Sequence, residues 1–269
     1  MKIACIGTGF VGVVTTAVFA SHGHEVAGLD IDENKVASLS KGQVPFFEPG
    51  LNELLNKTLV SGNLTFTTSY QEAITDAEII LIMVGTPSAA DGQADLKYVL
   101  ATAESMAPYL KEDAIVVIKS TVPPGTNKKI EKILKQKAKV SFTTASVPEF
   151  LREGTAVEDT LHPSRVVIGS TNKKAADKLA QLHRPLSDRI IVMKPESAQM
   201  SKYAANTYLA TRITFINQVA DLCEKNGADI QEVIAGIGED SRIGDHYWYP
   251  GFGYGGSCFP KDTWALIAY

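Results

Sequence analysis

Cysteine is scarce in this sequence, which has three such residues, Cys5, Cys223 and Cys258, among 269. They are too few and too far apart for a disulfide framework or a zinc site. The five histidines show no metal-ligand spacing either. We therefore expect no bound metal, and a reduced, cytoplasmic protein.

An excess of charge of one sign and long apolar runs are also missing. The formal net charge is −4, and Lys and Arg are scattered except in a basic run at 128–139 with helical apolar spacing. This balance argues against a nucleic-acid surface. Gly, Pro or charged residues break the apolar stretches well short of the roughly 20 residues that span a membrane. No signal peptide precedes the first strand-like run. From the charge balance we expect no nucleic-acid partner, and from the short apolar stretches we expect no membrane partner.

Strand-like and helix-like segments alternate through the first two-thirds of the chain. Apolar, β-branched runs occur at 2–6, 25–30, 77–84, 114–120, 139–146 and 164–169. Helical spacing occurs between them, at 10–23, 96–110 and 128–139. This alternation predicts an α/β fold with a Rossmann-like, doubly wound parallel sheet.

The pattern changes near Pro195. Residues 196–227 run without a break, with apolar residues at three- and four-residue spacing, which predicts one long helix. A second helix is predicted at 229–238. The chain stops inside a third predicted helix at 260–269, so we expect it to be truncated.

The segment GTGFVG (7–12) fits the G-x-G-x-x-G fingerprint, follows a strand and opens a helix in a unit that ends at Asp30. Gly7 is expected to make the tight turn. Gly9 would let the backbone approach a pyrophosphate, and Gly12 would allow close helix–strand packing. Asp30 can bind both ribose hydroxyls and would repel a 2′-phosphate, which favours NAD over NADP. The alternative is a structural glycine turn beside a surface aspartate.

Two threonines follow predicted strands, Thr86 in VGTP (84–87) and Thr121 in STVPPGT (120–126). Ligands collect at the carboxyl ends of parallel strands, so both threonines are candidates to line a cofactor crevice. Their alternative role is to cap the helix that follows.

Cys258 lies in the glycine-rich stretch GYGGSCFPKD (253–262), directly before a Phe-Pro pair that fits the start of a helix. A helix N-terminus and the nearby Lys261 favour thiolate over thiol, which makes Cys258 a candidate nucleophile. The alternative is a small buried residue. Cys5 and Cys223 suit that alternative better, because they lie in apolar segments.

Charged and polar residues at helical spacing offer further candidates. In KYAAN (202–206), Lys202 and Asn206 would share a helix face, with a surface lysine as the alternative. In PEFLREG (148–154), Glu149 and Glu153 are also four residues apart. They could act as acid and base or bind a ribose, with an exposed first turn of helix as the alternative.

The motifs occur in an order that resembles the UDP-glucose 6-dehydrogenase family of nucleotide-sugar dehydrogenases: GTGFVG, Asp30, VGTP, STVPPGT, PEFLREG, KYAAN and GYGGSCFPKD. The resemblance covers the whole chain. It implies oxidation of the C6 alcohol of UDP-glucose to a carboxylate, with two NAD per turnover. It also implies an NAD-binding Rossmann domain at 1–195 and a central helical region at 196–269 that forms a homodimer and carries the cysteine. We expect the family's C-terminal nucleotide-binding domain to be absent from this chain.

The resemblance also assigns chemical roles. Cys258 is the implied nucleophile, which traps an aldehyde as a thiohemiacetal and then carries a thioester. Lys202 would stabilise the oxyanion, with Asn206 as its hydrogen-bonding partner. The carboxylate of Asp262 would position the water or the lysine, and that of Glu149 would assist thioester hydrolysis.

The remaining assignments concern ligand contacts. Thr121 would hold a catalytic water. Besides the three glycines, the implied NAD contacts are Val11, Asp30, Lys35, Thr86, Thr121, Glu153 and Lys261. The implied nucleotide-sugar contacts are Glu149, Phe150, Leu151, Arg152, Lys202, Asn206, Tyr247, Trp248, Tyr249, Pro250, Gly251 and Gly255, while Arg242 would reach the substrate of a partner subunit.

Two departures from the family qualify these implications. Val147 stands where the family usually has asparagine, which removes a polar group near the site. The missing domain predicts weak substrate binding and little or no turnover by the 269-residue chain.

Three other functions stay open. The substrate could be GDP-mannose or a UDP-N-acetylhexosamine. A single-step β-hydroxyacid dehydrogenase could use Lys202 and Asn206 without any cysteine. The chain by itself could be a non-catalytic NAD-binding module.

Overall fold

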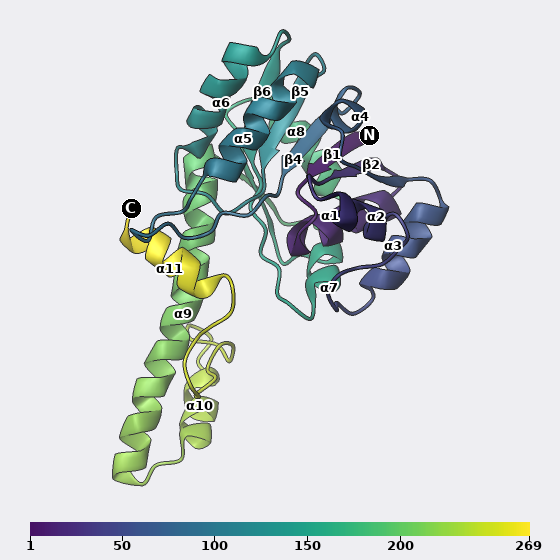
Figure 1. The fold of residues 1–269 in the computed structure, drawn as a ribbon. Helices are drawn as coiled ribbons and strands as arrows, with labels where there is room; N and C mark the ends of the chain where they lie inside the picture. Colours follow the sequence, from purple (N-terminus) through teal and green to yellow (C-terminus); the bar gives the residue numbers. More distant parts are fainter. The chain divides into compact units, whose positions relative to one another are not determined.

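The computed structural model describes residues 1–269 and is built on one eight-stranded sheet (Figure 1). The strand order is β3-β2-β1-β4-β5-β6-β7-β8, and neighbouring strands are parallel except β6 and β7. The strands are β1 (Lys2–Ile6), β2 (Glu25–Leu29), β3 (Leu64–Thr67), β4 (Ile79–Ile82), β5 (Ala114–Ile118), β6 (Phe142–Ser146), β7 (Val166–Gly169) and β8 (Ile190–Met193). The predicted doubly wound α/β fold is confirmed.

Helices cover both faces of this sheet, as strand–helix alternation requires. One face packs against α1 (Phe10–Ser21), α2 (Glu33–Leu39), α3 (Leu51–Val60), α7 (Ala156–Leu161) and α8 (Lys173–His183). The other face packs against α4 (Tyr70–Ile74), α5 (Lys97–Met106) and α6 (Thr126–Lys137). Every residue of β4 and β5 is buried, which explains why these strands are continuous apolar runs in the sequence.

Several short helices that the apolar pattern did not predict begin at capping side chains. Asp32 accepts a hydrogen bond from the Lys35 backbone at 3.1 Å at the start of α2. Ser69 caps α4, and Asn172 caps α8 in the same way. A polar side chain that accepts from the first turn replaces one of the helix's missing backbone bonds. These caps were the local signal for the missed helices.

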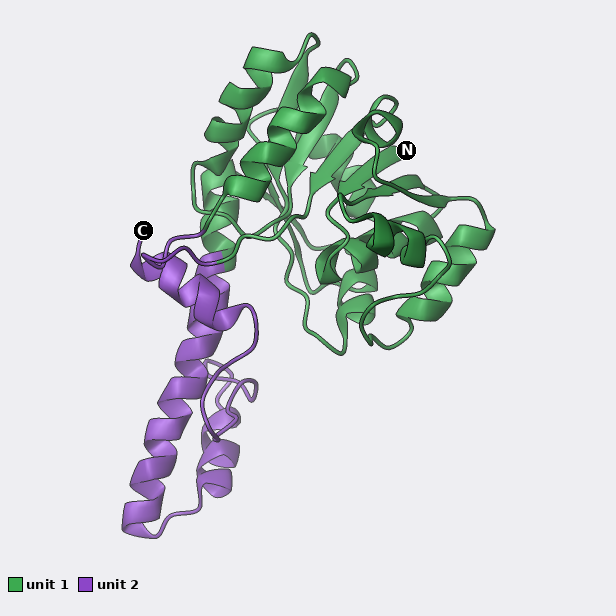
Figure 2. Ribbon diagram, in the orientation of Figure 1, with its two compact units in different colours: residues 1–87, 95–202 green, residues 88–94, 203–269 purple.

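Two compact units make up the chain (Figure 2). Unit 1 comprises residues 1–87 and 95–202, and unit 2 comprises 88–94 and 203–269. The boundary falls within the long helix α9 (Pro195–Asn226), which confirms the helix predicted at 196–227. Unit 2 also contains α10 (Ile230–Gly238) and α11 (Phe259–Ile267). None of the helices has a stretch both long and apolar enough to cross a membrane.

The buried His183 at the end of α8 should make the stability of the protein depend on pH. It is 5% exposed, its Nδ1 lies 2.8 Å from the Leu179 carbonyl oxygen, and its ring meets Phe19 edge-on. Burial, assisted by the positive charge of Lys119, lowers the pKa of His183 to about 4. Between about pH 6.5 and pH 4 the unfolded chain therefore binds a proton that the folded chain does not.

We expect the free energy of unfolding to fall as the pH is lowered through this window, by about 3 kcal/mol in total from His183. Urea unfolding of the parent and of His183→Leu at pH 7.5 and pH 4.5 measures the effect. The variant should lose less stability on acidification than the parent. Equal losses in the two proteins would show that another group is responsible.

Candidate functional site

The glycine loop joins β1 to α1 in a turn that only glycine fits. Gly7 has φ +96°, and a Cβ there would lie 2.8 Å from the Met83 carbonyl oxygen. A Cβ at Gly12 would lie 1.9 Å from the Gly7 carbonyl oxygen. A Cβ at Gly9 would meet nothing within 4 Å. The expected turn and close packing are therefore present, and the surface over Gly9 is open.

The first turn of α1 leaves its backbone N–H groups without a side-chain partner. Gly9 caps the helix and supplies no side-chain hydrogen bond, and the first turn holds no acidic residue. Val11 lies in this turn and is half-buried. Free N–H groups and the positive end of the helix dipole suit an anionic group here.

Asp30 follows β2 and is 9% exposed, so it is not the surface aspartate of the alternative interpretation. Its Oδ2 accepts hydrogen bonds from the Thr8 backbone (2.9 Å), the Thr8 hydroxyl (2.7 Å) and Lys35 Nζ (3.0 Å). Burial alone raises the pKa of Asp30, but these hydrogen bonds outweigh it and hold the pKa below its usual value. Thr8 was not among the predicted site residues, although its hydroxyl inside the glycine motif was a usable signal.

Thr86 and Thr121 connect the loops that follow β4 and β5. The Thr86 hydroxyl donates a 2.8 Å hydrogen bond to the Thr121 carbonyl oxygen. The N-caps of α5 and α6 are Leu96 and Gly125, so the alternative role in helix capping is wrong for both threonines. Two neighbouring strands thus present a linked pair of loops at their carboxyl ends.

The segment after β6 is irregular, so the alternative of an exposed first turn of helix is wrong for Glu149 and Glu153. The Glu149 Oε2 accepts a hydrogen bond from the Leu151 backbone at 2.6 Å, which turns the chain away from a helix. Arg152 forms an ion pair with Asp159 at 2.6 Å. Phe150 and Leu151 are half-buried, whereas Arg152 and Glu153 are exposed.

Glu48 holds the end of the same segment. It is 5% exposed, and its carboxylate accepts hydrogen bonds from the backbones of Gly154 (2.8 Å) and Ala156 (2.7 Å). This anchor was not predictable from the sequence, because no local pattern relates Glu48 to residues so distant along the chain.

Lys202 on α9 forms a nearly buried ion pair with Glu149. The Lys202 Nζ lies 2.9 Å from the Glu149 Oε1, and the side chains are 5% and 10% exposed. The alternative of a surface lysine is therefore wrong. The same ammonium lies 5.4 Å from the centre of the Phe150 ring, which also stacks on the Arg165 guanidinium at 3.8 Å. Charge in this part of unit 1 is concentrated and shielded from water.

Gln199, one turn before Lys202, fixes the loop that contains Gly125. Its Nε2 donates to the Asn127 Oδ1 (2.7 Å) and the Ser146 Oγ (3.1 Å), and its Oε1 accepts from the Gly125 backbone (2.9 Å). The neighbouring Val147 is 1% exposed and belongs to the apolar core. The polar group that Val147 lacks is thus replaced by apolar packing.

In unit 2, Asp262 is 1% exposed and joins two predicted site residues. Asn206 Nδ2 donates to its Oδ2 at 2.7 Å, and Lys261 Nζ lies 2.5 Å from its Oδ1. Asn206 therefore bonds to Asp262, not to the lysine that the resemblance implied. Lys261 likewise has its ammonium on this carboxylate.

Cys258 is the N-cap of α11 and is exposed, whereas Cys5 and Cys223 are buried. Its carbonyl oxygen accepts from the Asp262 backbone at 2.9 Å, and its Sγ lies 3.6 Å from the Ser257 hydroxyl. The alternative of a small buried residue is therefore wrong for Cys258. The thiol stands at the positive end of a helix dipole and is open to solvent.

Trp248 and Gly251 fix the loop before Cys258 to α9. Trp248 is 9% exposed, stacks on the Arg212 guanidinium at 3.7 Å and donates to the Gly244 carbonyl oxygen at 2.8 Å. Gly251 donates its backbone N–H to Asn217 Oδ1 at 2.8 Å. Trp248 thus has a packing role in this loop. The other predicted contacts of the loop are exposed or half-buried: Tyr247, Tyr249, Pro250 and Gly255.

Arg242 lies in the same stretch of unit 2. Its guanidinium pairs with Asp240 at 2.6 Å, and its side chain is 87% exposed. It is therefore held by its neighbour but open to solvent.

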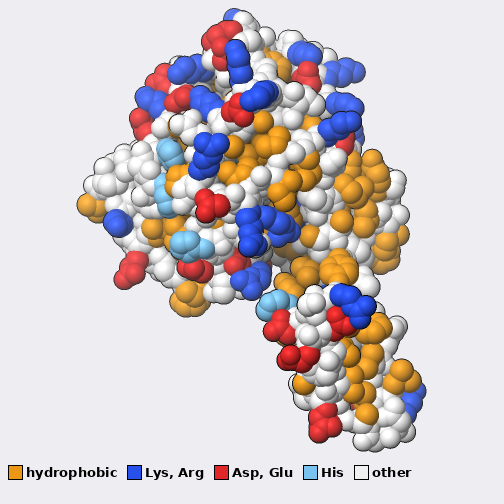
Figure 3. All heavy atoms as spheres, turned by 180° about the vertical axis from the view of Figure 1, so that it is seen from behind, with side chains coloured by type: hydrophobic (Ala, Val, Ile, Leu, Met, Phe, Trp, Pro, Cys, Tyr) orange, Lys and Arg blue, Asp and Glu red, His pale blue; other side chains and the backbone are white.

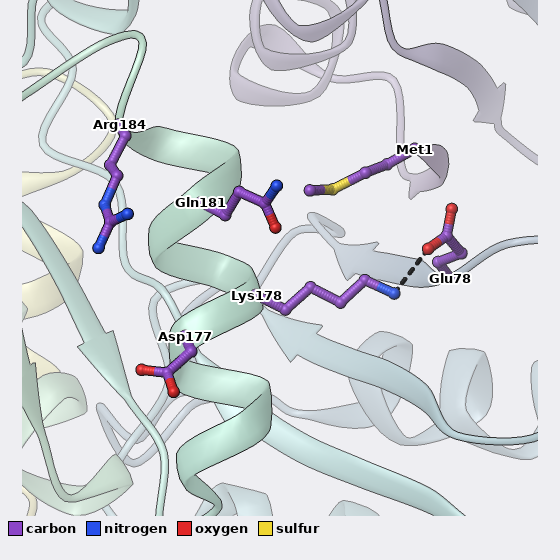
Figure 4. A pocket seen from close by; sticks show the side chains of 6 residues that line it. All are labelled: Met1, Glu78, Asp177, Lys178, Gln181 and Arg184. Carbon is purple, nitrogen blue, oxygen red and sulfur yellow. Dashed lines mark hydrogen bonds and ion pairs between the residues drawn. The ribbon is translucent and has the colours of Figure 1, made fainter.

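A hollow of about 670 Å³ lies at the opposite edge of the sheet (Figure 4). It is lined by Met1, Glu78, Asp177, Lys178, Gln181 and Arg184, and Lys178 pairs with Glu78 at 2.6 Å. Met1 and Glu78 precede β1 and β4, so the hollow is at the amino ends of the strands. None of the predicted site residues lines it, and ligands of such sheets bind at the carboxyl ends.

Comparison with known proteins matches the chain to two domains of one family. Residues 1–187 match the NAD binding domain of the UDP-glucose/GDP-mannose dehydrogenase family, and residues 196–269 match its central domain. The UDP-glucose 6-dehydrogenase YwqF of Bacillus subtilis (strain 168) is 48% identical over 269 residues, which are 99% of this chain and 61% of the relative. The chain thus spans about three-fifths of the length of such relatives.

Solved structures give the same result. A UDP-glucose dehydrogenase from the hyperthermophilic archaeon Pyrobaculum islandicum is 43% identical, with a TM-score of 0.96 over 98% of this chain and 62% of that one. A GDP-mannose dehydrogenase from Pseudomonas aeruginosa is 37% identical, with a TM-score of 0.86 over 99% of this chain and 64% of that one. With both of its domains matched, the chain belongs to the UDP-glucose/GDP-mannose dehydrogenase family and carries that family's NAD-binding fold.

Proposed function

We propose that the protein of which this chain is the NAD-binding and central part oxidises UDP-glucose to UDP-glucuronate through a covalent adduct on Cys258. The observation that carries the proposal is the exposed Cys258 thiol at the N-cap of α11, in a chain whose other two cysteines are buried. An exposed thiol can reach a substrate, and cysteine is a strong intrinsic nucleophile. A dehydrogenase that stopped at the aldehyde would have no use for such a group.

The residues of unit 1 fit NAD. The open surface over Gly9 and the uncapped N–H groups of α1 suit a pyrophosphate. Asp30 is kept ionised by Thr8 and Lys35, as a carboxylate that accepts from ribose hydroxyls must be. The linked Thr86 and Thr121 would line the crevice, with Val11, Glu153 and Lys261 as further contacts. NAD supplies the two-electron acceptor for each of the two oxidations.

The chemistry of the cysteine follows from the oxidation level of the product. The Cys258 sulfur forms a bond to the aldehyde carbon, which gives a thiohemiacetal that retains the hydrogen to be removed next. The second oxidation turns the adduct into a thioester. Water then adds to the thioester carbon, the carbon–sulfur bond breaks, and the thiolate leaves as the carboxylate forms. Without the sulfur, an enzyme of this kind would release the aldehyde.

Lys202 and Glu149 supply the charges that these steps need. The Lys202 ammonium would stabilise the negative charge that develops on the C6 oxygen. Glu149 would assist the attack of water on the thioester, and Thr121 would hold that water. Asp262 and Asn206, which are bonded to each other, would orient groups around the same carbon.

The nucleotide sugar is assigned from the relatives. The curated relatives at 48% and 49% identity are named UDP-glucose 6-dehydrogenases, whereas the GDP-mannose dehydrogenase structure is 37% identical. This difference favours UDP-glucose over GDP-mannose or a UDP-N-acetylhexosamine. The sugar nucleotide would contact Phe150, Leu151, Arg152 and the 247–251 loop with Gly255, while Arg242 would serve the substrate of a second subunit.

We further propose that the protein is a cytoplasmic homodimer joined through unit 2. No side chain of α10 is buried, and on α9 Tyr208, Phe215 and Leu222 are at least half exposed. Figure 3 shows hydrophobic side chains gathered along unit 2, in the lower part of the view. Three free cysteines without a disulfide fit a reducing compartment.

The test is the stoichiometry of the full-length protein. We expect two NADH per UDP-glucose from the parent, and no completed turnover from Cys258→Ser. Cys223→Ala, which removes a buried thiol, serves as the control and should retain the parent stoichiometry. One NADH per sugar from both the parent and Cys258→Ser would refute the cysteine mechanism. GDP-mannose and UDP-N-acetylmannosamine, assayed in parallel, test the choice of sugar.

A further inference from the structure

Lys119 is a buried lysine that the proposed chemistry does not use. It directly follows β5, its backbone N–H donates to the Ile82 carbonyl oxygen at 2.9 Å, and the residue is 9% exposed. Burial disfavours the charged form of a side chain, and it lowers the pKa of Lys119. A residue that weakens the fold in this way calls for a functional explanation.

The sheet register places Lys119 beside the segment that carries Glu149. Ile118 of β5 pairs with Ser146 of β6, and the Val147 backbone donates to the Ile118 carbonyl oxygen at 3.0 Å. Lys119 and Val147 are the next residues on the two strands. Val147 is apolar and buried, so it offers the ammonium no hydrogen bond.

The charges that act on Lys119 come from few groups. Glu149 is the strongest of those that favour its protonated form, and Lys202 of α9 opposes it. Cys5 of β1 has its pKa raised to about 12 by burial, so it is a neutral thiol near pH 7. His183 of α8, with a pKa lowered to about 4, is also neutral there. Near pH 7, Glu149 is therefore the anion facing Lys119, and Lys202 is the competing cation.

Glu149 is thus shared by two lysines, only one of which is bonded to it. Lys202 holds it at 2.9 Å, yet the proposed chemistry needs the Lys202 ammonium on the substrate oxygen. If Lys202 left, the Glu149 side chain, which is only 10% exposed, would keep a buried charge without a partner. That cost would hold Lys202 in place and slow the reaction.

We propose that Lys119 is a positioning residue that balances the charge of Glu149 when Lys202 turns to the substrate. The inference rests on the roles given to Lys202 and Glu149 under the proposed function. Lys119 touches neither substrate nor cofactor in this account. It lowers the energetic cost of moving the Lys202 ammonium from the Glu149 carboxylate to the substrate oxygen.

The experiment compares Lys119→Met and Lys119→Arg in the full-length protein. Lys119→Met removes the charge, and we expect about a tenfold or greater fall in kcat for UDP-glucose with the KM for NAD unchanged. Lys119→Arg keeps a charge that does not titrate, and it should retain more of the activity. The matched control is Lys178→Met, which breaks a lysine–glutamate pair at the other edge of the sheet and should leave kcat unchanged.

The pH profile separates a positioning role from a structural one. The parent should lose kcat at alkaline pH as Lys119 gives up its proton, whereas Lys119→Arg should keep its activity there. The melting temperature adds a readout without turnover. Lys119→Met should melt at or above the parent temperature at neutral pH, and any gain should shrink as the pH rises through the pKa of Lys119.

The proposal would be overturned if Lys119→Met had the same kcat and the same pH profile as the parent. A lower melting temperature in Lys119→Met together with no alkaline shift in Lys119→Arg would also overturn it, because that pair of results marks a structural residue. Failure of the proposed function has a different signature, namely one NADH per sugar in both the parent and Cys258→Ser. The melting comparison stands in either case.

Discussion

Gly12→Ala is expected to lower the free energy of unfolding by about 3 kcal/mol, which corresponds to a fall of roughly 10 °C in melting temperature. The added methyl group would sit 1.9 Å from the Gly7 carbonyl oxygen and 2.9 Å from its carbonyl carbon. Both are backbone atoms of the turn between β1 and α1, and they cannot rotate away as a side chain can. Thermal unfolding of this 269-residue chain measures the loss.

Gly9→Ala is the matched control, since it adds the same methyl group three residues closer to the strand. Gly9 has φ −73°, an ordinary value for alanine, and the methyl would meet nothing within 4 Å. We expect stability within about 1 kcal/mol of the parent. NAD affinity should fall by about tenfold or more, measured by calorimetry, because the methyl fills the space proposed for the pyrophosphate. Equal stability of the two variants would contradict the packing argument.

Glu149→Leu is the second substitution with a large expected effect. It leaves the Lys202 ammonium, which is 5% exposed, without the carboxylate 2.9 Å away. Breaking a buried ion pair from one side costs about 3–5 kcal/mol, because the remaining charge stays desolvated. Urea unfolding of the single variant at pH 7 measures this cost.

The double variant Glu149→Leu/Lys202→Met supplies the control. Removing both charges should return the stability to within about 1 kcal/mol of the parent, since an apolar pair replaces an ionic one. Lys202→Met alone should cost less than Glu149→Leu, because Lys119 still faces the carboxylate. Purely additive effects of the two single changes would mean that the pair does not stabilise either partner.

Much of the fold could be predicted because its signals are local. The central strands β4 and β5 are buried throughout and are therefore unbroken apolar runs. The strands at the two ends of the sheet, β3 and β8, were missed. Each has four residues and an incompletely buried pattern, so periodicity has little to act on. Edge strands are defined by their neighbours more than by their own residues.

The candidate site was predictable where a motif fixes the backbone. The glycine loop is such a case, because the spacing of Gly7 and Gly12 describes a turn and a close contact. The arrangement around Glu149 was not predictable in this way. Four-residue spacing between Glu149 and Glu153 is compatible with a turn of helix, but the Glu149 carboxylate bonds to the Leu151 backbone, which a spacing rule does not consider.

The burial of Lys202 was equally hidden in the sequence. Small residues around a lysine fit both an exposed and a buried helix face, and the ion pair with Glu149 crosses from α9 to the segment after β6. Tertiary contacts of this kind determine which charged residues pair. Residue patterns within one sequence do not reveal these contacts.

The Glu48 anchor has a consequence for the order of folding. Its bonds to Gly154 and Ala156 join residues 106 and 108 positions apart in the chain. Closing so long a loop is entropically costly until the intervening strands have assembled. The segment that carries Glu149 should therefore become ordered late, after the sheet is complete. During synthesis, the sheet would therefore form before the Glu149 segment of the candidate site takes its final position.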